Sequence, residues 1–164
     1  ANLALRRRYW PHDEENILAA QSSLASCLYD LGRFDEALVL QREVYAKNVA
    51  LGAEEDRLLT GGNLSSTLMR VGRFAEAKTL LRDELLPTAR RSLKPGDRLF
   101  MDLDEWLAHA LRRDPDATRD DLREAETILQ GVLQLRRRVF GPAHPTTAWC
   151  EKELAVVRDL LASH

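Results

Sequence analysis

The feature that most constrains the fold of this chain is an internal repeat with a spacing of 40 residues. The hexapeptide Gly-Arg-Phe-Asp-Glu-Ala that begins at Gly32 recurs as Gly-Arg-Phe-Ala-Glu-Ala at Gly72. The segment before each copy repeats at the same spacing, from Leu24 and from Leu64. A period of this size is typical of stacked repeat units, because one unit cannot bury its apolar surface alone.

Weaker copies extend the pattern toward both ends of the 164 residues. A third copy continues from Leu107 and Asp121, and the first half of a fourth begins at His144. Residues 3–10 are similar to residues 133–140, which end a second helix. We therefore expect one domain of three whole units between two halves, and a fragment of a longer array. The predicted units are 1–11 (half), 12–51, 52–94, 95–141 and 142–164 (half).

Each unit is predicted to hold two helices joined by a tight turn. In the first unit, selected residues recur at three- and four-residue steps, the period of one helix face. They are Ile17, Gln21, Leu24, Ala25, Leu28 and Leu31 in the first helix, and Phe34, Ala37, Leu38, Gln41, Val44 and Tyr45 in the second. Gly32 and Gly72 stand where a helix should end, because glycine accepts the left-handed conformation that closes it.

Several residues are typical of helix starts. The acidic pairs Glu14-Glu15 and Glu54-Glu55 suit a first turn, where negative charge is favourable. Asp121 and Glu124 have the spacing of a capping box, and Pro145 suits the first turn of a last helix. The sequence has no alternating strand pattern, so the predicted fold class is all-α, with seven main helices and a stub.

The leucine, glycine, phenylalanine and alanine spacings resemble the tetratricopeptide repeat, although this repeat is longer than the usual ~34 residues. The segment Phe-Gly-Pro-Ala-His-Pro at 140–145 is similar to the linker of the kinesin light chain subtype. Ala37, Ala77 and Ala125 stand where close helix packing in this family demands a small side chain. The resemblance implies an α-solenoid of antiparallel helix pairs, a right-handed superhelix. Its first helices would line a concave groove that binds a peptide or a partner helix.

The repeat register predicts which side chains face this groove. They are Ser22, Ser26 and Tyr29 in unit one, Asn63, Ser66, Met69 and Arg70 in unit two, Asp102, Glu105, Trp106, His109 and Arg113 in unit three, and, if unit four lines the same surface, Trp149 and Lys152. Family members that grip chaperone carboxylates use Lys, Asn and Arg at such positions, and here only Asn63 corresponds. A carboxylate clamp is therefore not expected. For Trp106 and Tyr29, partial burial between units is the alternative interpretation.

The sequence carries no motif for catalysis or for a cofactor. It has no phosphate-binding glycine loop and no metal-binding His-Glu-x-x-His segment. Cys27 and Cys150 are expected to be buried, unreactive thiols in a reducing, cytoplasmic environment. His109 is interpreted as a solvated groove side chain, with a pH-sensitive contact as the alternative. We therefore expect no enzymatic activity, no metal and no cofactor.

The charge pattern bears on the class of partner. The formal net charge is −2, and the arginine triplets 6–8 and 136–138 are expected to complement helix ends rather than bind nucleic acid. No apolar run approaches the ~18 residues of a membrane span. The predicted function is a protein-interaction module or scaffold. The alternative is a structural spacer that self-associates through its terminal helices, and burial of Trp106, Tyr29 and Met69 would favour it.

Overall fold

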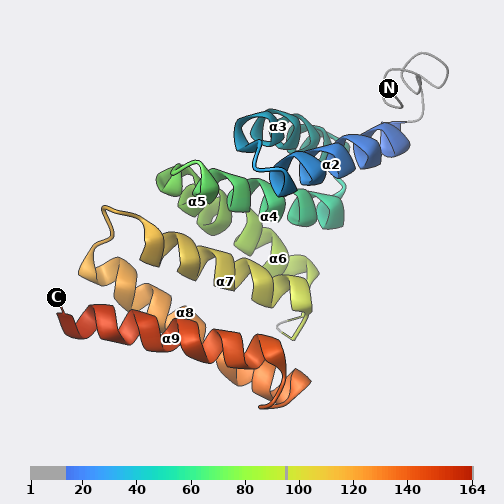
Figure 1. The fold of residues 1–164 in the computed structure, drawn as a ribbon. Helices are drawn as coiled ribbons and strands as arrows, with labels where there is room; N and C mark the ends of the chain where they lie inside the picture. The colour runs from blue at the N-terminus through green and yellow to red at the C-terminus, as the bar shows by residue number, and fades with distance from the viewer. Residues whose placement is uncertain (1–13, 95, 164) are drawn as a thin grey trace.

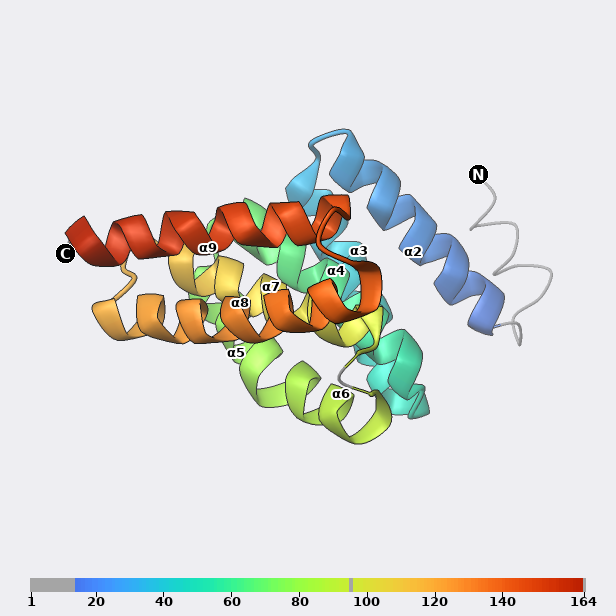
Figure 2. The ribbon, with the colours of Figure 1, turned by 90° about the horizontal axis from the view of Figure 1, so that it is seen from below.

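The computed structural model describes residues 14–94 and 96–163, and these fold into seven helical rods without a strand. The rods stack one after another, with α2 and α3 at one end and α8 and α9 at the other (Figure 1). They are α2 (Glu14–Asp30), α3 (Phe34–Leu51), α4 (Glu54–Arg70), the composite rod of α5 (Phe74–Thr79), η1 (Leu80–Leu85) and α6 (Leu86–Ser92), α7 (Arg98–Arg113), α8 (Arg119–Phe140) and α9 (Pro145–Ser163). The predicted all-α solenoid is confirmed, and the predicted stub lies outside the described residues. Figure 2 shows α8 and α9 side by side.

Equivalent turns close the first helices of two successive pairs. Gly32 and Gly72 adopt φ angles of 75° and 78°, the left-handed conformation expected of them. In the first turn the amide of Arg33 donates to the carbonyl of Leu28 at 2.9 Å, and the equivalent bond in the second turn measures 2.8 Å. These bonds satisfy carbonyl groups that the helix end leaves free. The shared turn geometry accounts for the repeated sequence around the two glycines.

The start of α8 differs from the predicted one. We expected Asp121 and Glu124 to form the capping box, but the N-cap is Thr118. Its hydroxyl accepts from the Asp121 amide at 3.1 Å, and the Asp121 carboxylate accepts from the Thr118 amide at 2.9 Å. The box therefore lies three residues earlier, because Thr118 has the extended backbone that an N-cap requires. The start of α9 at Pro145 is as predicted.

The second rod of the second pair contains a proline in its interior. Pro87 cannot donate a backbone hydrogen bond, and its ring would clash with the carbonyl four residues earlier in a regular helix. The chain widens into the π-helical segment η1 just before it, so that the amide of Leu86 donates to Leu81, five residues back. The hydroxyl of Thr88 donates to the Glu84 carbonyl at 2.9 Å. The rod thus continues past Pro87 without ending.

The three alanines at the repeated small-residue position are fully buried. Ala37, Ala77 and Ala125 each have an exposed fraction of 0%. Each lies in the first two turns of a second helix, where that helix approaches its neighbours. The predicted close packing is confirmed at all three positions.

Two leucines of the predicted apolar face of α2 are not buried. Leu24 is 44% exposed and Leu31 is 72% exposed. The residues equivalent to Leu24 in later units, Leu64 and Leu107, are 5% and 3% exposed. Those later helices are covered by the second rod of the preceding pair, whereas no described helix precedes α2. Neither leucine is therefore buried as a core face requires, and at the Leu24 position burial depends on a neighbouring unit.

We predict that Ala77→Leu destabilises the chain by about 1–3 kcal/mol, because a larger side chain overpacks a site with no free space. Ala75→Leu is the matched control, since Ala75 is exposed on the same helix. Chemical denaturation of both variants measures the difference. Equal stability of Ala77→Leu and the parent would contradict the assigned packing.

Candidate functional site

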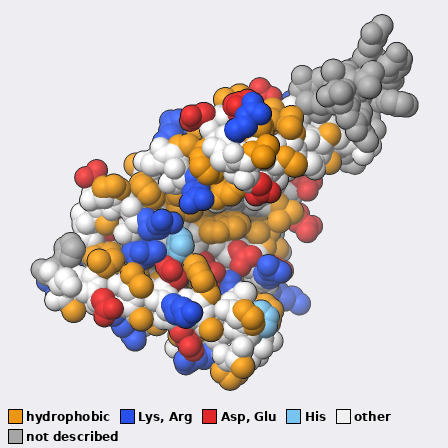
Figure 3. Space-filling model, viewed as in Figure 1, with side chains coloured by type: hydrophobic (Ala, Val, Ile, Leu, Met, Phe, Trp, Pro, Cys, Tyr) orange, Lys and Arg blue, Asp and Glu red, His pale blue; other side chains and the backbone are white. Residues whose placement is uncertain are grey.

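A cavity of about 300 Å³ opens between the first helices of successive pairs and α9; we call it the central cavity. It contains nine of the predicted groove residues together with one other, Phe74. Its lining residues are Tyr29, Ser66, Met69, Arg70, Phe74, Glu105, Trp106, His109, Arg113 and Trp149. Figure 3 shows hydrophobic side chains in the hollow between the upper and lower helices, with basic side chains beside it. The structure thus brings together residues that lie 120 positions apart in sequence.

Trp106 forms one wall of this cavity by lying directly on the backbone of α4. A Cβ atom placed on Gly62 would lie 2.1 Å from Cζ3 of Trp106, so no other residue fits at this position without displacing the ring. At Gly61, a Cβ atom would lie 2.5 Å from the Leu85 side chain. The sequence analysis did not predict this close contact between Trp106 and α4. Two glycines inside a helix cost about 1 kcal/mol each in helix stability, and such glycines indicate a packing reason. Trp106 is partly buried between units, which the alternative interpretation anticipated.

An aromatic cluster forms the α2 side of the cavity. The rings of Tyr29 and Phe34 meet edge to face at 5.3 Å, and the Tyr29 hydroxyl shares a hydrogen bond with Ser66 at 3.1 Å. The guanidinium of Arg70 lies over both rings, 5.2 Å from that of Phe34 and 5.9 Å from that of Tyr29. Within the described residues neither Arg70 nor Arg113 has a carboxylate partner. The cavity therefore offers two guanidinium groups beside aromatic surface.

His109 is not the solvated side chain that the first interpretation assumed. Its side chain is 20% exposed, and its Nε2 atom lies 2.9 Å from Glu153 on α9. The same carboxylate oxygen accepts from Arg112 at 2.9 Å, and the Trp149 ring lies 5.1 Å from the imidazole. Burial lowers the pKa of His109 below its ordinary value, and the charges of Arg112 and Arg113 lower it further against the opposing effect of Glu153.

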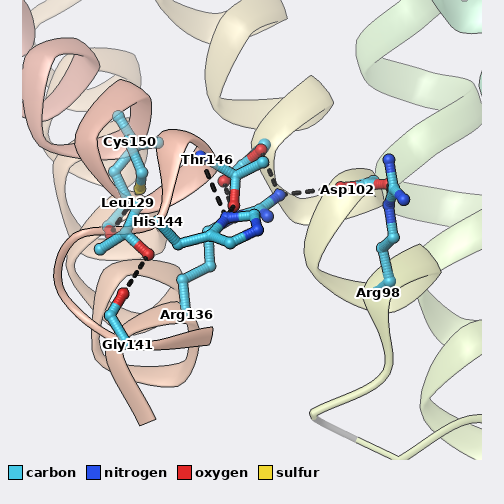
Figure 4. Close-up of polar contacts among 10 residues, drawn as sticks. Arg98, Asp102, Leu129, Arg136, Gly141, His144, Thr146 and Cys150 are labelled. Atoms are coloured by element: carbon cyan, nitrogen blue, oxygen red, sulfur yellow. Dashed lines mark hydrogen bonds and ion pairs between the residues drawn. The ribbon is translucent and has the colours of Figure 1, made fainter. Parts of the chain in front are cut away.

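Glu105 does not offer its carboxylate to the groove as predicted. It is 6% exposed and receives two hydrogen bonds from Arg136, at 2.5 and 2.8 Å. Arg136 is itself 2% exposed and also donates to Asp102, which lies near Arg98 (Figure 4). The expectation that Arg136 only complements a helix end was wrong, because α7 places two carboxylates opposite it. A buried pair of this kind is costly to break, since one charge is left without its partner.

A second cavity of about 340 Å³ lies beyond Trp149, which lines both cavities. Its other lining residues are Asp102, Glu105, Arg136, Pro145 and Thr146. The imidazole of His144 fixes this corner by stacking on Phe140 at 5.0 Å and bonding to the Thr146 hydroxyl at 2.8 Å. The groove therefore extends from the central cavity toward the start of α9.

Five predicted groove residues lie outside the central cavity. Asp102 lines the second cavity, and Lys152 lines none of these cavities. Ser22 and Asn63 line a separate small crevice between α2, α3 and α4. Ser26 is exposed and lines none of these cavities. The predicted groove residues therefore do not share one cavity. Ser22 and Asn63 line the small crevice, whereas the aromatic residues line the central cavity.

The two cysteines differ, although both were expected to be buried. Cys27 is exposed on α2, whereas Cys150 is fully buried on α9. Burial raises the pKa of Cys150 to about 12. Cys27 faces outward from the same uncovered side of α2 as Leu24, which is why its burial was wrongly predicted.

We predict that a thiol reagent such as Ellman's reagent modifies Cys27 rapidly and leaves Cys150 unmodified in the folded chain. The thiolate is the reactive form, and burial suppresses both its formation and its access at Cys150. Cys27→Ser should abolish the fast phase. A fast phase that persists in Cys27→Ser would show that Cys150 is not buried between α9 and the helices it packs against.

Two further features bear on function. Among residues 14–94 and 96–163, no three His, Cys, Asp or Glu side chains gather in a way that could hold a metal ion. Within the same residues, no helix combines the length and apolar character needed to cross a bilayer.

Comparison with known proteins identifies the repeat. Residues 17–54 and 117–146 match the family model of the tetratricopeptide repeat. These two segments are tetratricopeptide repeats. Repeats of this family generally mediate protein–protein interaction. No curated protein matches the chain in sequence.

Solved structures of kinesin light chain-like proteins share the fold. A putative kinesin light chain of nearly identical repeats from Podosopora anserina is 23% identical, with a TM-score of 0.76 over 85% of this chain. A single-substitution variant of that protein gives 21% identity and a TM-score of 0.81 over 99% of this chain and 74% of its own length. BtubC (BKLC) from P. vanneervenii is 19% identical, with a TM-score of 0.74 over 94% of this chain. This chain spans 64% of the length of the first structure and 61% of BtubC, so these matches establish the fold alone.

We predict that Gly62→Ala destabilises the stack of helices, because the added methyl group collides with the Trp106 ring. Gly131→Ala is the matched control, since Gly131 lies in α8 with open space around its Cβ position. The control should gain up to about 1 kcal/mol from helix propensity. Thermal unfolding of both variants measures the contrast. If Gly62→Ala were as stable as Gly131→Ala, Trp106 would not lie on α4.

Proposed function

We propose that this chain binds an extended peptide segment of a partner protein in its groove, centred on the central cavity. The observation that carries the proposal is the meeting of two unpaired guanidinium groups, Arg70 and Arg113, with aromatic surface in one cavity. The proposed module is non-enzymatic and acts in the cytoplasm without a cofactor. Its repeat units remain 12–51, 52–94 and 95–141 between two half-units.

The chemistry of the cavity suggests how such a segment would be held. Arginine binds carboxylates through paired N–H groups, so Arg70 and Arg113 would receive acidic groups of the peptide. Trp106 and Met69 supply apolar surface for a neighbouring side chain, and a partly buried tryptophan is a common interface anchor. The Tyr29–Ser66 pair offers hydroxyl groups to the peptide backbone. The peptide would continue past Trp149 into the second cavity.

We predict that Arg70→Gln combined with Arg113→Gln weakens binding of peptides selected from a random display library at least tenfold. Loss of two charge-assisted hydrogen-bond partners removes more than 1.4 kcal/mol of binding free energy, the equivalent of that factor. Fluorescence anisotropy of the selected peptides measures the affinity.

The matched control is Arg119→Gln combined with Arg138→Gln, which removes the same charge from exposed positions of α8 outside the central cavity. This variant should bind as the parent does. Equal binding by both double variants would place the peptide elsewhere on the chain.

Self-association through the terminal helix α2 is a second candidate function. The exposed Leu24 and Leu31 favour it, because their side of α2 has no covering helix among the described residues. Sedimentation of the parent and of Leu31→Ser over a range of concentrations distinguishes this function. A complex that forms in the parent and is lost in the variant would support it.

A further inference from the structure

The central cavity carries positive charge that its own lining does not neutralise. Arg70 and Arg113 line it, and neither forms an ion pair within residues 14–94 and 96–163. Glu105 is the one carboxylate among the lining residues, and it already receives two hydrogen bonds from Arg136. Both cavity arginines are exposed, so a ligand from solution can reach them. A lining of this charge favours an anionic ligand.

Arg70 is held in position before any ligand arrives. Its guanidinium lies over two aromatic rings, 5.2 Å from the centre of Phe34 and 5.9 Å from that of Tyr29. Stacking on a ring uses the flat face of the guanidinium, and the N–H groups at its edge stay available to donate. Two of these N–H groups can bind two oxygen atoms of one anion. A side chain that is already positioned loses less conformational entropy on binding.

A pair of hydroxyl groups adds a neutral donor beside Arg70. The hydroxyl oxygens of Tyr29 and Ser66 lie 3.1 Å apart, so one hydroxyl donates to the other. The accepting hydroxyl keeps its own proton, and within the described part of the chain neither hydroxyl has a second hydrogen-bond partner. Both residues line the cavity, so this remaining proton is available to an anion there.

A phosphate monoester matches these donors better than a carboxylate does. At pH 7 a phosphoryl group on a side chain carries a charge of about −1.5 to −2 and has three acceptor oxygens. It can therefore neutralise Arg70 and Arg113 together, whereas one carboxylate leaves one of them without a counter-charge. Hydrogen bonds between such charged groups are roughly twice as strong as those between neutral groups.

The apolar part of the lining selects the group that carries the phosphate. Met69, Phe74, Trp106 and Trp149 form apolar walls, and the volume of about 300 Å³ is at the small end of ligand pockets. A phosphorylated tyrosine would cover these walls with its ring, because aromatic rings pack favourably against one another. The short side chain of phosphoserine would leave the same walls in contact with water, which is unfavourable.

We propose that the central cavity recognises a phosphorylated tyrosine of the peptide segment that occupies the groove. This inference rests on the proposed function, and it names the residue that the cavity selects. Arg70 and Arg113 bind the phosphoryl oxygens, the Tyr29–Ser66 pair donates one further hydrogen bond, and Trp106 contacts the tyrosine ring. Phosphorylation of the partner protein therefore increases its affinity for this chain.

The test uses a random peptide library with a phosphotyrosine fixed at its centre. Peptides that bind are synthesised again with phosphotyrosine, tyrosine or phosphoserine at that position, and fluorescence anisotropy measures their affinity for the full chain. We expect the phosphotyrosine form to bind at least tenfold more tightly than the tyrosine form and at least fivefold more tightly than the phosphoserine form. Equal binding of the phosphoserine and phosphotyrosine forms would overturn the assignment of a tyrosine ring.

Variants locate the phosphoryl group through the ratio of the affinities for the phosphotyrosine and tyrosine forms. This ratio is unaffected when a variant merely loses stability, because both peptides meet the same folded fraction. Arg70→Gln and Arg113→Gln should each lower the ratio at least fivefold. The matched control is Arg73→Gln, since Arg73 is exposed nearby but pairs with Glu76 and lies outside the cavity. An unchanged ratio in both cavity variants, or an equal fall in the control, would overturn the proposal.

Two small probes examine the cavity without a peptide. Phenyl phosphate should shift the indole N–H signals of Trp106 and Trp149 in a nuclear magnetic resonance titration, and phenol at the same concentration should not. The signals are assigned with Trp106→Phe and Trp149→Phe. Tighter binding of adenosine monophosphate than of phenyl phosphate would assign the cavity to a nucleotide and overturn the proposal.

The peptide measurements also separate this inference from the proposed function. If peptides bind in the groove with equal affinity in their phosphotyrosine and tyrosine forms, the proposed function stands and the phosphotyrosine inference fails. If no peptide binds in any form, the proposed function fails and the inference fails with it.

Discussion

The structure depends on the contact between Trp106 and the bare backbone of Gly62. This contact sets how closely α4 and α7 approach, and therefore how the second and third helix pairs stack. An indole ring buries a large apolar area, and its lost hydration stabilises the junction. The same ring then forms a wall of the central cavity. Trp106 can approach the α4 backbone this closely because Gly62 has no side chain. The same contact therefore determines both how the helix pairs stack and where the central cavity forms.

The parts of the fold that sequence could predict are those set by local chemistry. Gly32 and Gly72 close helices because glycine adopts a positive φ at little cost, and their turns repeat with the sequence. The buried alanines at 37, 77 and 125 follow from the same register. Nine groove residues could be placed in one cavity because the register fixes which side of each first helix they share. Each of these predictions needed only the period of a helix and the spacing of the repeat.

The predictions that failed concern contacts between units. Leu24 has the right period for a core face, but its equivalents Leu64 and Leu107 are buried because a preceding rod covers them. Glu105 has the right period for the groove, yet Arg136, thirty-one residues later, draws its carboxylate into the interior. The link of His109 to Glu153 joins residues 44 positions apart, and no repeated motif marks it. A pattern within one helix carries no information on which partner lies opposite, so these pairings required the structure.

The measurement that tests this account most directly is a nuclear Overhauser spectrum of the labelled chain, read at the α protons of Gly62. A ring seated on this glycine predicts strong cross-peaks from the Gly62 α protons to the Trp106 ring protons. It also predicts that the ring current moves one of these α protons well upfield of its ordinary position. An absence of both effects in the folded chain would contradict the account. Trp106 would then not join α4 to α7, and the central cavity would not exist as described.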